Sequence, residues 1–148
     1  MSDDYYADIL PPVIRIGLYL LQSGRARVEQ DLFQRGRRTL LLPLAVVGGP
    51  VATPRDAIDE GGPHHGVGLF WAAKLPLPNR RPPISSKFAR TWMLLAGRRP
   101  RRGERMTSAL FEHKRVLGSV RTVVHDHNGR PLPEWMQYSV CQDLVAWG

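Results

Sequence analysis

The fold of this chain is decided by residues 85–97, which read SSKFARTWMLLAG. The serine at position 85 or 86 can accept a hydrogen bond from the first free amides of a helix. Phe88, Trp92 and Leu95 then fall on one helical face, and Gly97 supplies the left-handed residue that commonly ends a helix. We therefore expect one capped amphipathic helix here, within a chain whose other segments have the patterns of strands.

The segments before this helix predict strands and one long loop. Val13–Leu20 alternates well enough for a strand with Ile14, Ile16, Leu18 and Leu20 on one face, although a helix is the competing prediction. The other candidates are Arg27–Phe33 (a strand or a short helix), Thr39–Val47, whose Pro43 would confine it to a sheet edge or a bulge, and Val67–Leu75. Residues 48–66 are rich in glycine and proline and predict a long loop.

The segments after the helix predict a short helical turn and a closing hairpin. Met106–Phe111 suits one turn of helix. The clearest strand is 115–124, with Val116, Val120 and Val124 pointing inward and Arg115 and Arg121 outward. A turn built on Asn128-Gly129 then leads to a closing strand from Trp135 towards Trp147.

Length and composition indicate one soluble domain with an excess of positive charge. The chain has 148 residues, of which 43% are hydrophobic, and a net charge of +8. Only three of its 21 basic residues are lysines, and arginine is the residue best suited to phosphate and base contacts. The single cysteine, Cys141, excludes an intrachain disulfide.

Residues 1–10 lack the basic start and apolar core of a signal peptide, and the longest apolar run, Leu40–Val47, is too short to span a bilayer. We expect a cytoplasmic protein with no membrane association. Residues 1–10 are predicted to be a flexible lead-in, and residues 11–148 a single domain. The expected fold class is mainly β, a small OB-like barrel with its one helix between the third and fourth strands.

A resemblance in the second half of the chain agrees with this layout. It rests on six short segments: Ser86–Trp92, Gly97–Pro100, Arg105–Thr107, Val120–Val123, Arg130–Pro133 and Tyr138–Val140. These segments resemble a set of small uncharacterised proteins encoded on bacterial mobile elements, which are similar in layout to phage-type OB-fold single-strand-binding proteins. The resemblance covers residues 85–145, favours a binding module and identifies no catalytic residue.

The candidate binding residues are arginines and aromatic side chains. Arginines can follow a phosphate backbone, and exposed rings can stack on unpaired bases. The predicted nucleic-acid-binding residues are Arg98, Arg99, Arg101, Arg102, Arg105, Arg115, Arg121, Arg130, Trp135 and Tyr138. Phe70 and Trp71 are further aromatic candidates, but Trp71, like Phe88 and Trp92, is assigned to the core.

Other chemistry has little support in the sequence. The histidines at 64, 65, 125 and 127 have no spacing specific for a metal, and no serine or cysteine has a recognisable base and orienting acid. We expect no cofactor, no metal and no enzymatic activity. The leading hypothesis is a single-stranded nucleic-acid binding accessory protein of a mobile element or phage-like system, with DNA favoured over RNA. One alternative is a basic interaction subunit of a larger nucleoprotein or virion assembly. Another is a ligand-sensing or enzymatic β-barrel with residues 48–66 lining a pocket.

Overall fold

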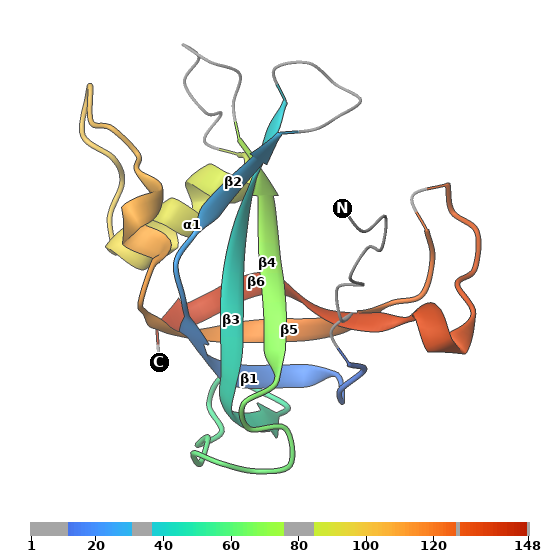
Figure 1. Cartoon of the computed structure of the whole chain (residues 1–148). Coiled ribbons are helices and arrows are strands. Elements are labelled where there is room, and N and C mark those ends of the chain that lie inside the picture. The colour runs from blue at the N-terminus through green and yellow to red at the C-terminus, as the bar shows by residue number, and fades with distance from the viewer. Residues whose placement is uncertain (1–11, 31–36, 76–84, 127, 148) are drawn as a thin grey trace, which may run out of the picture.

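The computed structural model describes residues 12–30, 37–75, 85–126 and 128–147 (Figure 1). Of these, Ala146 and Trp147 are described by their backbone alone. The predicted lead-in at residues 1–10 lies outside this part. The strands are β1 (Gly17–Ser23), β2 (Arg27–Gln30), β3 (Arg38–Val51), β4 (Gly68–Lys74), β5 (Arg115–Val123) and β6 (Tyr138–Trp147). The α-helix α1 (Lys87–Ala96) and the short 3-10 helix η1 (Ser108–Phe111) lie between β4 and β5, and a second 3-10 helix, η2 (Glu134–Met136), lies between β5 and β6.

The six strands form one antiparallel sheet, which confirms the mainly β prediction. The order is β2-β3-β1-β5-β6, and β4 pairs with the opposite edge of β3. β4 and β6 lie close to one another, but no ladder joins them in the described residues, so the sheet is curled and not closed. An OB-like barrel is therefore not confirmed. The helix follows the fourth strand and not the third, because the four-residue β2 forms a strand of its own.

β3 is the longest strand, and it exchanges partners next to a proline. One edge of β3 pairs with β4, while the other edge pairs with β2 as far as Leu41 and with β1 from Leu44 onward. At this gap the amide of Gly24 donates to the carbonyl of Pro43 over 2.9 Å. Because the nitrogen and carbonyl of a strand residue face the same edge, the missing N–H of Pro43 lies in the gap and breaks no ladder.

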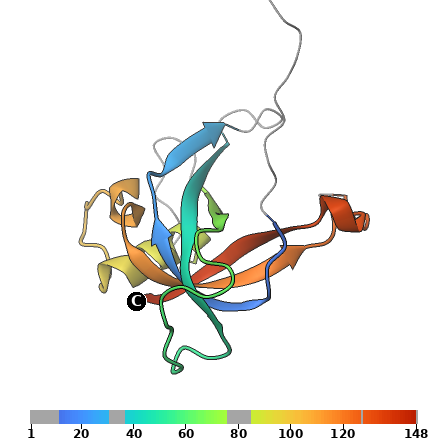
Figure 2. The same ribbon diagram turned by 60° about the horizontal axis from the view of Figure 1, so that its bottom comes forward.

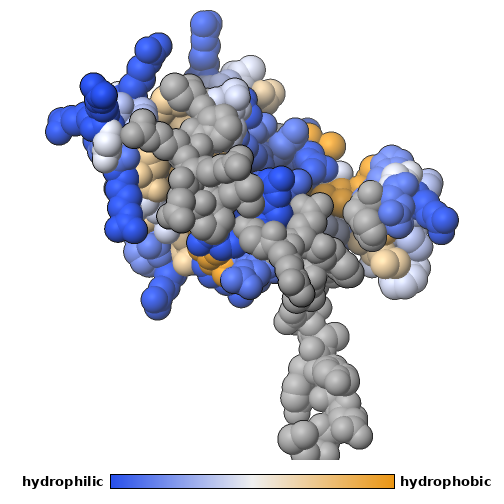
Figure 3. All heavy atoms as spheres, turned by 90° about the horizontal axis from the view of Figure 1, so that it is seen from above, coloured by the Kyte–Doolittle hydropathy of each residue, from blue (hydrophilic) through white to orange (hydrophobic). Residues whose placement is uncertain are grey.

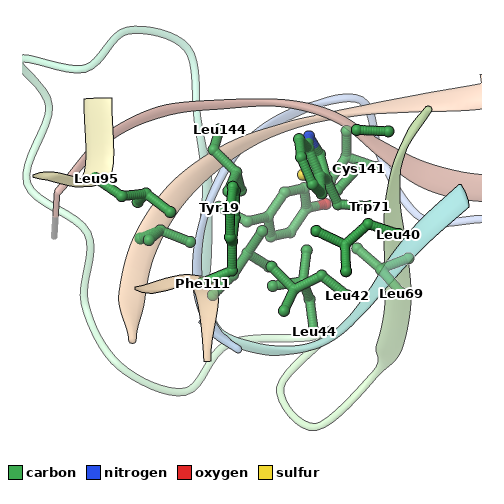
Figure 4. Close-up of a cluster of buried hydrophobic side chains, with 14 of the residues drawn as sticks. Tyr19, Leu40, Leu42, Leu44, Leu69, Trp71, Leu95, Phe111, Cys141 and Leu144 are labelled. Atoms are coloured by element: carbon green, nitrogen blue, oxygen red, sulfur yellow. The ribbon is translucent and has the colours of Figure 1, made fainter. Parts of the chain in front are cut away.

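The helix forms as predicted and covers one end of the curled sheet. The Ser86 hydroxyl accepts a hydrogen bond from the amide of Ala89, and Gly97 ends the helix in the left-handed region with φ 69°. Phe88 stacks on Phe111 of η1, and Phe111 stacks in turn on Trp71 of β4, with ring centroids 5.5 Å apart in each pair. These rings join the leucines of β3 in one hydrophobic core (Figure 4).

The predicted inward face of β1 is wrong by one residue. Ile16 is 68% exposed and Leu18 and Leu20 are only partly buried, whereas the buried residues of β1 are Tyr19, Leu21 and Ser23. Two of these buried side chains are polar, and the main chain satisfies both. The Tyr19 hydroxyl donates to the carbonyl of Arg15 at 2.6 Å, and the Ser23 hydroxyl accepts from the amide of Lys114 at 2.7 Å. Ile14 is buried, but it precedes the strand.

Three other boundaries differ from the predictions. β5 ends at Val123, so Val124 leaves the sheet and is 38% exposed, while Val116 and Val120 are buried as expected. β3 continues to Val51, so the loop expected from residue 48 begins later. Trp135 lies in η2, before β6 begins.

Candidate nucleic-acid interface

The segment that follows α1, which we call the arginine loop (residues 98–105), is closed by one acidic side chain. The Arg98 guanidinium donates to both carboxylate oxygens of Glu104, at 2.8 and 2.6 Å, and lies over the Trp92 ring at 5.5 Å. The amide of Arg101 also donates to Glu104 at 2.8 Å. Arg98 is thus engaged within its own loop, although the sequence predicted it as a phosphate contact.

The other arginines of this loop point outward. Arg99, Arg101, Arg102 and Arg105 are exposed, and none of them forms an ion pair within the described residues. A loop held in shape by Glu104 therefore presents guanidinium groups that are open to an external anion.

The clamp on Glu104 has a measurable consequence. The hydrogen bonds from Arg98 and from the Arg101 amide lower the pKa of Glu104 to about 2. Because this pKa is depressed, the contact is fully formed above the ordinary glutamate pKa and is lost as the pH falls towards 2. We expect an NMR titration of the Glu104 carboxyl group to show this low pKa and Arg98→Ala to raise it. Arg102→Ala, which removes an equal charge, should leave the pKa near 2. An equal rise in both variants would contradict the clamp.

The outward arginines of β5 have different surroundings. Arg115 and Arg121 both lie on the exposed face of the strand, as predicted. Arg115 forms an ion pair with Glu60, from the segment between β3 and β4, whereas Arg121 has no ion partner in the described residues. Arg115 is thus partly neutralised, and the predicted arginine track is interrupted there.

The connection between β5 and β6, residues 124–137, forms a projecting hairpin that its own hydrogen bonds hold in shape (Figure 2). The carboxylate of Asp126 accepts hydrogen bonds from the amides of Asn128 and Arg130, each at 2.9 Å. The amide of Leu132 donates to the carbonyl of Val124 at 2.7 Å. These hydrogen bonds hold the backbone of the hairpin that carries Arg130 and Trp135.

Trp135 is the most exposed large hydrophobic side chain of the described residues. It lies in η2 and 81% of its surface is accessible, which agrees with the prediction of an exposed ring. Arg130 is also exposed, and Tyr138, the first residue of β6, is partly buried opposite Val123. Trp71, Phe88 and Trp92 are buried, as assigned from the sequence.

The ten predicted binding residues do not form one surface. Figures 1 and 2 both place the arginine loop beside α1 on one side of the molecule and the hairpin on the opposite side. The structure therefore divides these residues into the five arginines of the arginine loop, a hairpin group of Arg130 and Trp135 with Tyr138 at the start of β6, and Arg115 and Arg121 on β5.

A further aromatic position lies on the outer face of β3 and β4. Phe70 is 37% exposed, and the Arg27 guanidinium of β2 lies over its ring, 5.7 Å from the centroid. Pro43 lies directly opposite Phe70 on this face and is partly buried, and the small residues Ala45, Gly68 and Ala72 near them are exposed. The sequence pattern marked Phe70 as a candidate but missed Arg27, because the partnership depends on β2 pairing with β3.

Comparisons with protein-family models, with curated proteins and with solved structures gave no match to this chain. Among the described residues, no three or more His, Cys, Asp or Glu side chains gather in a way that could hold a metal ion. None of the helices in the described ranges is long and apolar enough to cross a membrane.

Proposed function

We propose that this protein binds single-stranded nucleic acid and that its ligand is DNA and not RNA. In this proposal the protein is a cytoplasmic, non-enzymatic accessory of a mobile element or phage-like system. The observation that carries the proposal is the exposure of Trp135 on a hairpin whose backbone is hydrogen-bonded to Asp126. A large ring presented to solvent in this way favours contact with a partner over a structural role.

The chemistry around the two exposed rings suits unpaired bases. Every base has a π-face that can stack on an indole or phenyl ring, and a duplex does not offer these faces. Arg130 lies in the same hairpin as Trp135, where it can contact a phosphate. Arg27 lies over Phe70 and also forms an exposed ion pair with Glu29 over 3.5 Å, so a phosphate there would compete with the Glu29 carboxylate.

The resemblance to small mobile-element proteins, which are similar in layout to OB-fold single-strand-binding proteins, supports the same proposal. If β1 and β2 are counted as one interrupted strand, β3 and β4 take the place of the second and third strands of such a fold. OB-folds bind oligonucleotides on the face of these strands and on adjacent loops. Phe70 lies on that face, and the hairpin takes the place of the loop between the last two strands.

The contribution of the arginine loop can be tested by measuring how the affinity for a single strand depends on salt concentration. Each phosphate contact on a single strand contributes roughly 0.7 to the slope of log K against log salt concentration. Replacing Arg99, Arg101 and Arg102 by alanine should therefore flatten the slope by about 2 if each contacts one phosphate. Oligonucleotide titrations by fluorescence anisotropy at several salt concentrations measure this change.

The matched control is Arg55→Ala, which removes an exposed arginine from the segment between β3 and β4. It should leave the slope unchanged. If the triple variant has the slope of the parent, the arginine loop does not bind the strand.

A second candidate function is a basic interaction subunit of a nucleoprotein or virion assembly. The exposed apolar side chains Val13, Ile16 and Val124 favour it, because such side chains are often covered by a partner. Gel filtration distinguishes the two functions. An autonomous binder elutes as a defined species, whereas a subunit without its partner associates or aggregates.

A further inference from the structure

Exposed apolar side chains concentrate where the hairpin joins the sheet. Of the seven large hydrophobic residues that are exposed in the described part of the chain, five belong to the hairpin or to residues 12–16. They are Val13, Ile16, Val124, Trp135 and Met136. We call this set the hairpin surface, and Figure 3 shows apolar atoms between the projecting hairpin and the body of the protein.

Hydrogen bonds hold the two contributing segments together. The amide of Ile14 donates to the Ser139 hydroxyl at 2.8 Å, and the amide of Ser139 donates to the carbonyl of Pro12 at 3.4 Å. Ser139 is the second residue of β6 and follows η2 closely in the chain. Residues 12–16 therefore run beside the base of the hairpin, and the chain that precedes Pro12 is attached at this point.

The hairpin surface is accompanied by positive charge. Arg15, Arg121 and Arg130 are exposed, and the ion pairs of the described residues involve other arginines. A segment with both aromatic and acidic side chains would complement this surface, because its rings would cover apolar side chains and its carboxylates would pair with guanidinium groups.

Residues 1–11 have this composition. They contain Asp3, Asp4 and Asp8 together with Tyr5 and Tyr6, and no lysine or arginine. The two tyrosines are six or seven residues from Pro12, so they can reach roughly 20–25 Å from it. Because the segment is part of the same chain, its effective concentration at the surface is of millimolar order, and weak contacts are sufficient for docking.

We propose that residues 1–11 dock on the hairpin surface, with the tyrosines against its apolar side chains and the aspartates paired with its arginines. Docking places the segment over Trp135 and beside Arg130. The segment then competes with single-stranded nucleic acid for Trp135 and Arg130. This competition rests on the proposed function, whereas the docking does not.

The docking step is tested without nucleic acid. Asp3→Asn/Asp4→Asn and Tyr5→Ser/Tyr6→Ser should shift the indole N–H resonance of Trp135, assigned by Trp135→Phe, and increase its fluorescence quenching by acrylamide. Asp56→Asn/Asp59→Asn is the matched control for the aspartates, because it removes the same charge from the segment between β3 and β4. This control should change neither signal.

An unchanged Trp135 signal in both N-terminal variants would overturn the proposal. A difference that appears only as protein concentration rises would also overturn it, because the occupant would then be a second copy.

The competition step is tested with an oligo(dT) strand at low salt. Asp3→Asn/Asp4→Asn should bind it several-fold more tightly than the parent, and Asp56→Asn/Asp59→Asn should bind it less tightly than Asp3→Asn/Asp4→Asn does. Equal affinity of the two double variants would overturn competition. If Trp135 responds to the N-terminal variants but no protein binds oligo(dT), docking stands and the proposed function fails.

Discussion

Val120→Asp is expected to remove much of this protein's stability. Val120 is 3% exposed and lies in the middle of β5, paired with Gly17 of β1 and Cys141 of β6. A carboxylate there would lose its water without gaining a partner, at a cost of several kcal/mol. Domains of this size have a total stability of about 5–15 kcal/mol, so this cost is comparable to the whole stability at the lower end of that range. Urea unfolding followed by circular dichroism measures the effect.

The matched control is Val124→Asp, the same change four residues along the chain. Val124 lies beyond the end of β5 and is 38% exposed, so its variant should unfold within about 0.5 kcal/mol of the parent. The sequence alone predicted equal burial for the two valines. Similar losses in both variants would contradict the end of β5 at Val123.

Trp135→Ala is expected to weaken single-strand binding about 5- to 150-fold, which corresponds to the roughly 1–3 kcal/mol of one stacked base. Its effect on stability should be small, because the indole is 81% exposed and packs little against the core. Fluorescence anisotropy with a labelled single strand measures the affinity, and thermal unfolding measures the stability.

Two controls separate stacking from other causes. Trp135→Phe retains an aromatic face and should retain most of the affinity. Binding to a duplex, where phosphate charge dominates, should change little in Trp135→Ala. Equal weakening for single strand and duplex, or a large loss of stability, would remove Trp135 from the binding site.

The helix and the core were predictable because their signals are local. The Ser86 cap, the apolar face of Phe88 and Trp92 and the Gly97 stop lie within one short segment, and the structure contains all of them. The burial of Trp71 followed in the same way from its alternation with Leu69 in β4.

The inward face of β1 was not predictable from alternation, because hydrophobicity favoured the wrong residues. Ser23 is buried, and its hydroxyl bonds the backbone at Lys114, which is 91 residues away in the sequence. Tyr19 is buried with its hydroxyl satisfied by the Arg15 carbonyl. Both depend on partners that a period-two pattern does not contain.

The candidate interface was predictable in its residue types but not in its arrangement. Trp135 was named as a candidate ring from the sequence and is exposed, whereas the ion pairs of Arg98 with Glu104 and of Arg115 with Glu60 depend on loop closure and tertiary contact. The separation of the arginine loop from the hairpin depends on the strand order and has no local signal.

The most direct test of the proposed function is a titration of the unmodified protein with a single-stranded DNA and with a duplex of the same length, at two salt concentrations. We predict that the single strand binds more tightly than the duplex and that its affinity falls steeply with salt. Equal affinity for both forms, or no binding of the single strand at the lower salt concentration, would contradict the proposed function.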